Sequence, residues 1–176
     1  MTETTEATEA TEATEATEAE KRQPRTMGFT ELKSWLRHRH PMVYLDRILD
    51  YEPGEYVKSL MAVSGQTDAI SGHFPERAIF PASHMMQAIA QSAIILAQLS
   101  TSPLADDEIT LIGSVKARFT HVVVPGDQIV FHTTCESLRG NFLTFACRAE
   151  VSGKPVAMTR GSLVRTKVTD LGEQLW

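Results

Sequence analysis

Residues 81–99 read PASHMMQAIAQSAIILAQL, and the rest of the chain has to accommodate this stretch. No Asp, Glu, Lys or Arg occurs between Arg77 and Ala105. A helix without a charged face is covered by protein on all sides, because it has no face that favours water. We therefore predict one long buried helix over about residues 82–99, opened by Pro81.

Segments with the alternation of β-strands surround this helix. Apolar residues recur at every second position in four later runs, at residues 109–119, 129–135, 143–151 and 156–166. Two earlier runs are also predicted to be strands, at residues 43–49 and 56–63. Turn residues separate the later runs, at residues 125–127, 139–141 and 152–155. Short turns predict antiparallel neighbours. The economical arrangement, in the α+β class, is an antiparallel sheet of about six strands curled round the helix.

The composition is that of an ordinary soluble domain, with 176 residues, 42% of them hydrophobic and 22% charged. The two cysteines, Cys135 and Cys147, are too few for a disulfide framework and favour a reducing compartment. The chain begins without a signal-peptide pattern, and no run reaches the roughly 20 apolar residues of a membrane span. We therefore expect a cytoplasmic protein.

Acidic charge is concentrated at the N-terminus. Residues 1–20 contain seven Glu and no Asp, Lys or Arg, and residues 5–19 are five Thr-Glu-Ala repeats. A three-residue step builds no apolar helix face, so we predict a disordered acidic tail and linker over residues 1–26. One domain is then expected at 27–168, with a C-terminal tail at 169–176. The 156 residues after the repeat region hold 17 basic and 15 acidic residues, a balance that does not favour nucleic-acid binding.

Four motifs resemble those of the bacterial 3-hydroxyacyl-carrier-protein dehydratases of the FabZ/FabA type. In chain order they are HRHPMVYLDRI (38–48), GHFP with IFP and QAIAQ (72–75, 79–81 and 87–91), KARF (116–119) and VPGDQ (124–128). The resemblance covers about residues 34–166. It implies the hot-dog fold, in which a curled antiparallel sheet encloses one long helix.

This resemblance implies a dehydration, in which C2 of a 3-hydroxyacyl thioester loses a proton and C3 loses its hydroxyl group. The family places a histidine and a carboxylate on opposite sides of that bond. The matching base here is His73, and an imidazole with an ordinary pKa of about 6.5 can remove a proton near neutral pH. Backbone N–H groups after Pro81 would bind the thioester oxygen.

The sequence departs from the family pattern at two positions. The family's Pro-Gly is here followed by Ala82, whose methyl group costs stability if that position needs a positive φ. The family's carboxylate, six residues after the proline, is here Gln87. A glutamine donates and accepts hydrogen bonds but does not titrate, so we expect Gln87 to be a catalytic-site residue of altered role.

Further residues are expected to contact the substrate, namely Gly72, Phe74, Phe80, Pro81, Ala82, His84 and Gln91. Four of the candidate site residues also have a structural alternative. His73 is otherwise a turn histidine, and Gln87 a helix glutamine bonded to a neighbouring strand. His84 shares a helix face with Gln87 and is either a substitute acid or a packing histidine. Gln91 is either a site residue or bonded to nearby backbone.

The implied function is dehydration of a substrate on acyl carrier protein, in a fatty-acid or polyketide-like specialised pathway, with no metal or cofactor. Family members pair so that one subunit supplies the histidine and the other the acid. Our hypothesis is therefore the His-donating half of a heteromeric dehydratase, within a homo- or heterodimer or a trimer of dimers. The alternatives are a non-catalytic hot-dog subunit that binds carrier protein and a hot-dog thioesterase. The thioesterase is disfavoured because the helix offers no carboxylate. Arginines of the body are candidate contacts for an acidic carrier protein, and the acidic tail is a candidate screen for them.

Overall fold

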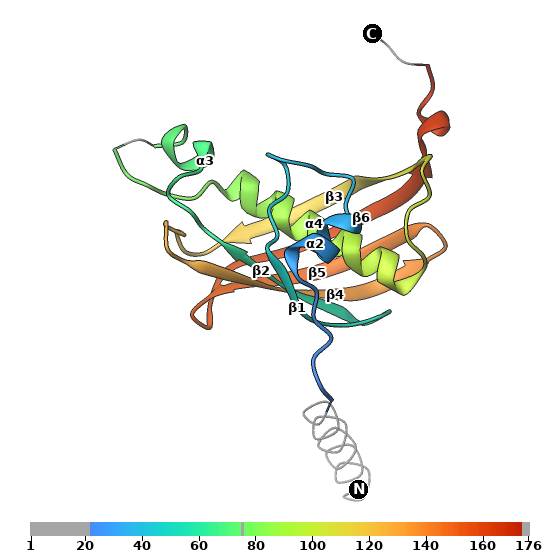
Figure 1. Cartoon of the computed structure of the whole chain (residues 1–176), viewed down its shortest axis with the longest axis horizontal. Coiled ribbons are helices and arrows are strands. Elements are labelled where there is room, and N and C mark those ends of the chain that lie inside the picture. Colours follow the sequence, from blue (N-terminus) through green and yellow to red (C-terminus); the bar gives the residue numbers. More distant parts are fainter. Residues whose placement is uncertain (1–21, 75, 174–176) are drawn as a thin grey trace, which may run out of the picture.

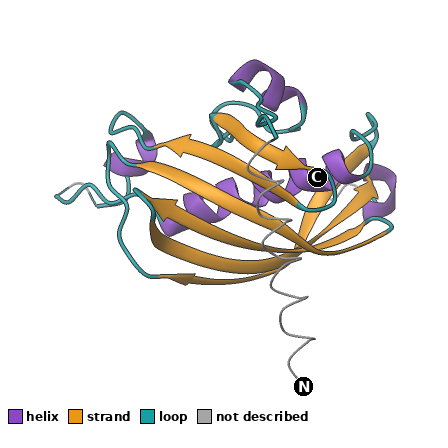
Figure 2. Cartoon of the chain, turned by 90° about the horizontal axis from the view of Figure 1, so that it is seen from below, coloured by secondary structure: helices purple, strands orange, loops and turns teal. Residues whose placement is uncertain are grey.

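Helix α4 (Ala82–Ser100) crosses one face of a curved six-stranded antiparallel sheet in the computed structural model, which describes residues 22–74 and 76–173 (Figure 1). Eleven of its side chains are buried, including every residue from Ala88 to Leu96. Figure 2 shows the strands curling round it. The buried helix inferred from the absence of charge is thus confirmed within one residue at its C-terminal end.

The sheet order is β1-β2-β4-β5-β6-β3. The strands are β1 (Arg47–Glu52), β2 (Tyr56–Ala62), β3 (Glu108–Phe119), β4 (Gln128–Arg139), β5 (Phe142–Val151) and β6 (Lys154–Lys167). Three short helical segments lie outside the sheet, α2 (Phe29–Ser34), α3 (Asp68–Ser71) and the 3-10 turn η1 (Val168–Leu171). Of the disordered tail and linker predicted over residues 1–26, residues 1–21 lie outside the described residues, as do the last three residues of the predicted C-terminal tail. Residues 22–26 are described, and Arg22 and Arg25 bond acidic side chains of β1.

One inference about strand pairing was wrong. The turn at residues 125–127 predicts that the strands on either side of it are neighbours, but β3 pairs with β6 and β4 pairs with β2. The segment that links β3 to β4 instead forms backbone hydrogen bonds with residues next to α4 and β2. Phe80 N donates to Val123 O, and Val63 N donates to Asp127 O. A Pro-Gly-Asp turn reverses the chain locally without specifying which strand comes to lie beside it.

The first predicted strand is also displaced along the chain. Residues 43–46 precede β1 instead of forming its beginning, because their backbone is bonded elsewhere. The N–H of Tyr44 donates to the side chain of Gln91 on α4, at 2.9 Å. The N–H of Asp46 donates to Leu60 O, and the Asp46 carboxylate accepts from Ala62 N at 2.6 Å.

A buried polar contact fixes α4 against the centre of the sheet. The hydroxyl of Ser92 accepts hydrogen bonds from Ser59 on β2 and Thr133 on β4, each at 3.0 Å, and none of the three side chains is exposed. Beside them, burial raises the pKa of the Cys147 thiol to about 12, so this cysteine stays protonated and unreactive. The helix therefore has one defined position along these strands.

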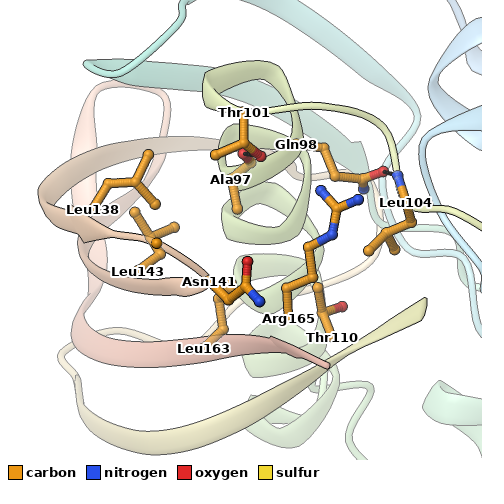
Figure 3. A pocket seen from close by; sticks show the side chains of 11 residues that line it. Ala97, Gln98, Thr101, Leu104, Thr110, Leu138, Asn141, Leu143, Leu163 and Arg165 are labelled. Carbon is orange, nitrogen blue, oxygen red and sulfur yellow. Dashed lines mark hydrogen bonds between the residues drawn. The ribbon is translucent and has the colours of Figure 1, made fainter. Parts of the chain in front are cut away.

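Two buried glutamines of α4 hold the N-terminal segment. Gln98 donates to Trp35 O at 2.6 Å and accepts from Leu104 N at 2.9 Å, the second contact being visible in Figure 3. Gln91 donates to Met42 O at 2.6 Å besides accepting from Tyr44 N. Buried polar groups are stable only when paired, so these amides specify where residues 35–44 pack. No helix within residues 22–74 and 76–173 is long and apolar enough to cross a membrane.

We predict that Gln98→Leu lowers the free energy of unfolding by about 1–3 kcal/mol, because it leaves the partly buried Trp35 O and Leu104 N without these partners. Urea denaturation would measure the change. Gln128→Leu is the matched control, since Gln128 is exposed, and its effect should stay within about 0.5 kcal/mol. Equal stability of the two variants would show that the Gln98 contacts contribute nothing.

Candidate active site

His73 lies in the loop between α3 and α4, immediately after the residue that ends α3. That residue is Gly72, where an added Cβ would lie 3.0 Å from Asp68 O, tighter than ordinary contact. The Gly72 N–H donates to the same carbonyl oxygen at 2.8 Å. The glycine thus lets the short helix close tightly, and the imidazole follows directly from this turn.

The orientation of His73 is set by one backbone hydrogen bond. Its Nδ1 lies 3.0 Å from Ile79 O. A carbonyl oxygen can only accept, so Nδ1 must carry the proton, and the neutral ring has its lone pair on Nε2. The ring is half-buried and lies 3.9 Å, centroid to centroid, from the exposed ring of Phe74. The neighbouring Pro75 of the motif lies outside the described residues.

Two residues after Ile79, helix α4 begins with an uncapped N-terminus. Pro81 is the N-cap, and no side chain caps it. His84 is the first residue of α4 whose N–H makes a helical hydrogen bond, to Pro81 O at 3.1 Å. The N–H groups of Ala82 and Ser83 therefore have no helical acceptor. Both residues are exposed. Ala82 has no positive φ, so its methyl group is not strained here.

His84, Gln87 and Gln91 follow one another at helical spacing on α4, but their environments differ. Gln91 is fully buried, and its amide is bonded to the backbone of residues 42 and 44. Gln87 is half-buried, and its amide makes no hydrogen bond to any residue in the described part of the chain. The structure therefore gives Gln91 a positioning role, while a direct substrate contact of Gln91 stays a prediction.

A hollow of about 540 Å³ opens beside the start of α4. His84 and Phe80 line it from the helix side, and Tyr44 lies opposite, with its ring 5.3 Å from that of His84 in an edge-on arrangement. Burial raises the pKa of the Tyr44 hydroxyl, which therefore remains a donor. Asp68 on α3 closes the far side. Phe80 is itself buried, so it serves both the core and this wall.

Sequence reasoning assigned no role to Tyr44, although Tyr44 belongs to the HRHPMVYLDRI motif. Its placement depends on the hydrogen bond from its own N–H to Gln91, a long-range contact that the local pattern does not reveal. His40 and Met42 line the same hollow through the same segment. The motif therefore contributes a wall of this hollow, which Phe80 and His84 also line and which His73 and Gln87 do not.

A second cavity beside α4 is a poorer candidate. The cavity at the far end of α4, shown in Figure 3, has a volume of about 20 Å³, enough for about one water molecule. Arg165 lines this cavity, and its guanidinium group donates to Ser102 O at 2.8 Å and to Pro103 O at 2.9 Å. No cluster of three or more His, Cys, Asp or Glu suited to a metal ion occurs within residues 22–74 and 76–173.

One long helix enclosed by a sheet, with a histidine in the loop before its uncapped start, is an arrangement that defines a class of proteins. Comparison with known proteins identifies that class. Residues 36–160 match the family model described as a FabA-like domain. The chain is 72% identical over 155 residues to coronafacic acid dehydratase of Pseudomonas savastanoi pv. glycinea, covering 88% of this chain and 94% of that protein. It is 36% identical over 137 residues to the 3-hydroxyacyl-acyl-carrier-protein dehydratase FabZ of Actinobacillus pleuropneumoniae serotype 5b, covering 77% and 88%.

Among solved structures, the dehydratase heterocomplex ApeI:P from Xenorhabdus doucetiae aligns with a TM-score of 0.68 at 15% identity, covering 86% of this chain and 96% of that one. This likeness concerns the fold, and it confirms the hot-dog architecture. The chain belongs to the FabA-like family. The relatives with which it shares most of its length are dehydratases, so the predicted family is confirmed as well.

We predict that the neutral imidazole of His73 carries its proton on Nδ1. Long-range ¹H–¹⁵N correlation spectra distinguish the two tautomers, and His73 should give the pattern of a protonated Nδ1 and a bare Nε2. His84 is the comparison, because its Nδ1 contacts the Ser83 hydroxyl at 3.3 Å, which can donate as well as accept. A proton found on Nε2 of His73 would contradict the geometry.

Proposed function

We propose that this chain is a cytoplasmic dehydratase that removes water from a carrier-protein-bound 3-hydroxyacyl thioester, giving the 2-enoyl form in a specialised fatty-acid or polyketide-like pathway. Family membership supports the reaction class. A relative named for coronafacic acid supports a specialised product. The observation that carries the proposal is the His73 imidazole, held by Ile79 O beside the uncapped start of α4.

In the proposed reaction, His73 acts as the general base. The bare Nε2 takes the proton from C2, while the Nδ1–H bond to Ile79 O keeps the ring in position and stabilises the imidazolium that forms. As the proton leaves, negative charge develops on the thioester oxygen. The free N–H groups of Ala82 and Ser83, at the positive end of α4, are suited to receive that oxygen.

Gln87 occupies the position at which the resemblance implies a carboxylate. Its amide has no partner among the described residues, so it is free to hold the C3 hydroxyl group of a substrate. It cannot supply the proton that turns this hydroxyl into water, because an amide does not titrate in this range. In the proposed heterodimer, the site that uses His73 of this chain is completed by the equivalent position of a second hot-dog subunit instead of by Gln87, and the carboxylate there supplies the proton.

The edge of the sheet offers a surface on which such a subunit can pair. The edge strand β1 is bonded on its outer side by Met27, which exchanges two backbone hydrogen bonds with Ile48. The opposite edge strand β3 pairs with β6 alone within the described chain, and it exposes Leu111, Ile112, Val115 and Phe119. An apolar edge left open invites a further strand. We propose that two sheets join there, as a homo- or heterodimer or a trimer of dimers.

We predict that His73→Ala lowers dehydration of a carrier-protein-bound 3-hydroxyacyl substrate by about 10²–10⁴-fold, the usual size of a general acid–base contribution. Ultraviolet absorbance of the conjugated enoyl thioester would follow the reaction. Gln87→Glu should raise the rate of the isolated chain by a comparable factor. His121→Ala is the matched control, because His121 also bonds a backbone carbonyl, Pro155 O, but lies exposed elsewhere.

Unchanged activity of His73→Ala would overturn the base assignment. No activity in the wild-type chain or in Gln87→Glu, with folded protein in both, would instead favour a non-catalytic subunit that binds carrier protein.

We predict that two chains that each lack one of the two groups together make a complete active site if that site is shared between subunits. The wild-type chain supplies His73, and the double variant His73→Ala, Gln87→Glu supplies only the carboxylate. Co-expression should give a heterodimer with one complete site and an activity far above either chain alone. If Gln87→Glu alone is active but the co-expressed pair is not, both groups belong to one chain, and the shared site is excluded.

A further inference from the structure

The face of the sheet that points away from α4 carries most of its charge in basic side chains. They form what we call the basic face, made of Lys58, Lys116, Arg118, His132, Arg148 and Arg160. Strand alternation separates this face from the core, since the buried residues Val57, Phe131 and Cys147 each precede one of these side chains in the chain. A shallow hollow of about 590 Å³ lies over it.

The strand register places these residues in two rows across the sheet. In the first row, Lys58 pairs with His132, His132 with Arg148, and Arg148 with Met158, which pairs with Arg118 on the edge strand β3. In the second row, Tyr56 on β2 pairs with Thr134, Thr134 with Ala146, and Ala146 with Arg160, which pairs with Lys116. The second row therefore becomes more positive toward β3, whereas the first row carries basic side chains from β2 to β3.

Acidic neighbours balance only part of this charge. Glu150 contacts Arg148 at 2.6 Å and His132 at 3.6 Å, and Glu136 contacts Arg160 at 2.9 Å. Lys58, Lys116 and Arg118 form no ion pair within the described part of the chain. The five Lys and Arg side chains of the basic face therefore exceed its two Glu partners by three charges, and a ligand for this surface has to be anionic.

The described part of the chain begins beside β1, the strand at which this face carries acidic residues. Both rows start on β1, where Asp50 pairs with Lys58 in register and Glu52 pairs with Tyr56. Arg22, the first described residue, donates to Asp50 at 2.8 Å and to the Tyr56 hydroxyl at 3.0 Å. Arg25 contacts Glu52 at 3.2 Å. The basic linker thus neutralises the two acids on β1, and the first described residue lies at the border of the basic face.

We propose that the acidic repeat segment, residues 3–20, docks on the basic face of its own chain. Its seven Glu complement a surface with an excess of three positive charges, and it joins the described chain next to the first row. In this arrangement, Arg22 and Arg25 of the linker neutralise Asp50 and Glu52 on β1. The glutamates of the repeat segment then lie over the Lys and Arg side chains of the basic face.

The length of the segment suffices for this contact. Five strand spacings separate β1 from β3 in the sheet order, a distance of about 24 Å at about 4.8 Å each. Eighteen residues reach about 27 Å as a helix and about 60 Å when extended. The Arg22 contact also keeps the local concentration of the segment high, so weak individual ion pairs can act together.

The test uses the full chain and a variant in which all seven Glu of residues 1–20 are replaced by Gln. The reporter is the imidazole of His132, which is faced by Lys58 from β2 and by Arg148 and Glu150 from β5. Burial, then Lys58, lowers the pKa of His132, and docked carboxylates would raise it again. In low salt, the NMR titration of His132 should lie about half a pH unit higher in the wild type than in the variant.

Two controls separate docking from a general effect of charge. His121 lies outside the basic face, so its backbone amide resonance should be the same in both chains. With Arg118→Gln and Arg148→Gln added to both chains, the difference at His132 should disappear, as it should at about 1 M salt. An identical His132 titration in the wild type and the Glu-to-Gln variant would overturn the proposal.

A second measurement identifies the occupant. A polyglutamate peptide should bind the Glu-to-Gln variant about tenfold more tightly than the wild type, because the native segment competes for the same surface. Equal binding to both chains would mean that the basic face is open to another acidic protein, and the proposed occupant would then be wrong.

Discussion

Complete burial of α4 is the constraint on which the other features depend. A helix enclosed by a sheet can keep polar side chains only where each finds a partner, and here each partner fixes a different segment. Ser92 bonds the neighbouring strands β2 and β4, Gln91 bonds the segment that carries Tyr44, and Gln98 bonds the end of α2. The polar residues within the apolar helix therefore position the N-terminal part of the chain that forms one wall of the hollow beside the start of α4.

The first turn of the same helix is where this enclosure ends. Ala82, Ser83 and Met86 are exposed, whereas every residue from Ala88 to Leu96 is buried. Free N–H groups at the start of a helix favour negative charge, and leaving them open to solvent has no structural advantage. The sheet also leaves β3 unpaired on one side. Both open features are consistent with the proposed shared site, because a second subunit at β3 adds protein where one chain alone leaves the site incomplete.

Sequence patterns within one segment predicted the long helix and the strands. Contacts between segments far apart in the chain could not be predicted from such patterns. Absence of charge predicted the helix within one residue at its end, and alternation predicted the four later strands to within four residues of their observed bounds, whereas the first strand was displaced. The pairing of β3 with β6 was missed because the 125–127 turn is compatible with several strand orders. The hollow at Tyr44 was missed for a related reason, since it depends on a hydrogen bond to Gln91 across 47 positions of the chain. The resemblance supplied His73 and Gln87 as candidates, and their catalytic roles stay predictions.

The two faces of the sheet separate the two kinds of charge that the proposed activity involves. The inner face is apolar around α4, where a carboxylate would be costly unless paired, and the helix carries none. Every acidic group of the N-terminal segment would lie on the outer face, behind the sheet from His73. Seven extra carboxylates near the imidazole would favour its protonated form and so weaken it as a base. Docking these carboxylates on the basic face keeps them away from the site. The proton for the leaving hydroxyl group then comes from one carboxyl group at position 87 of a partner, whose pKa is set by its own surroundings.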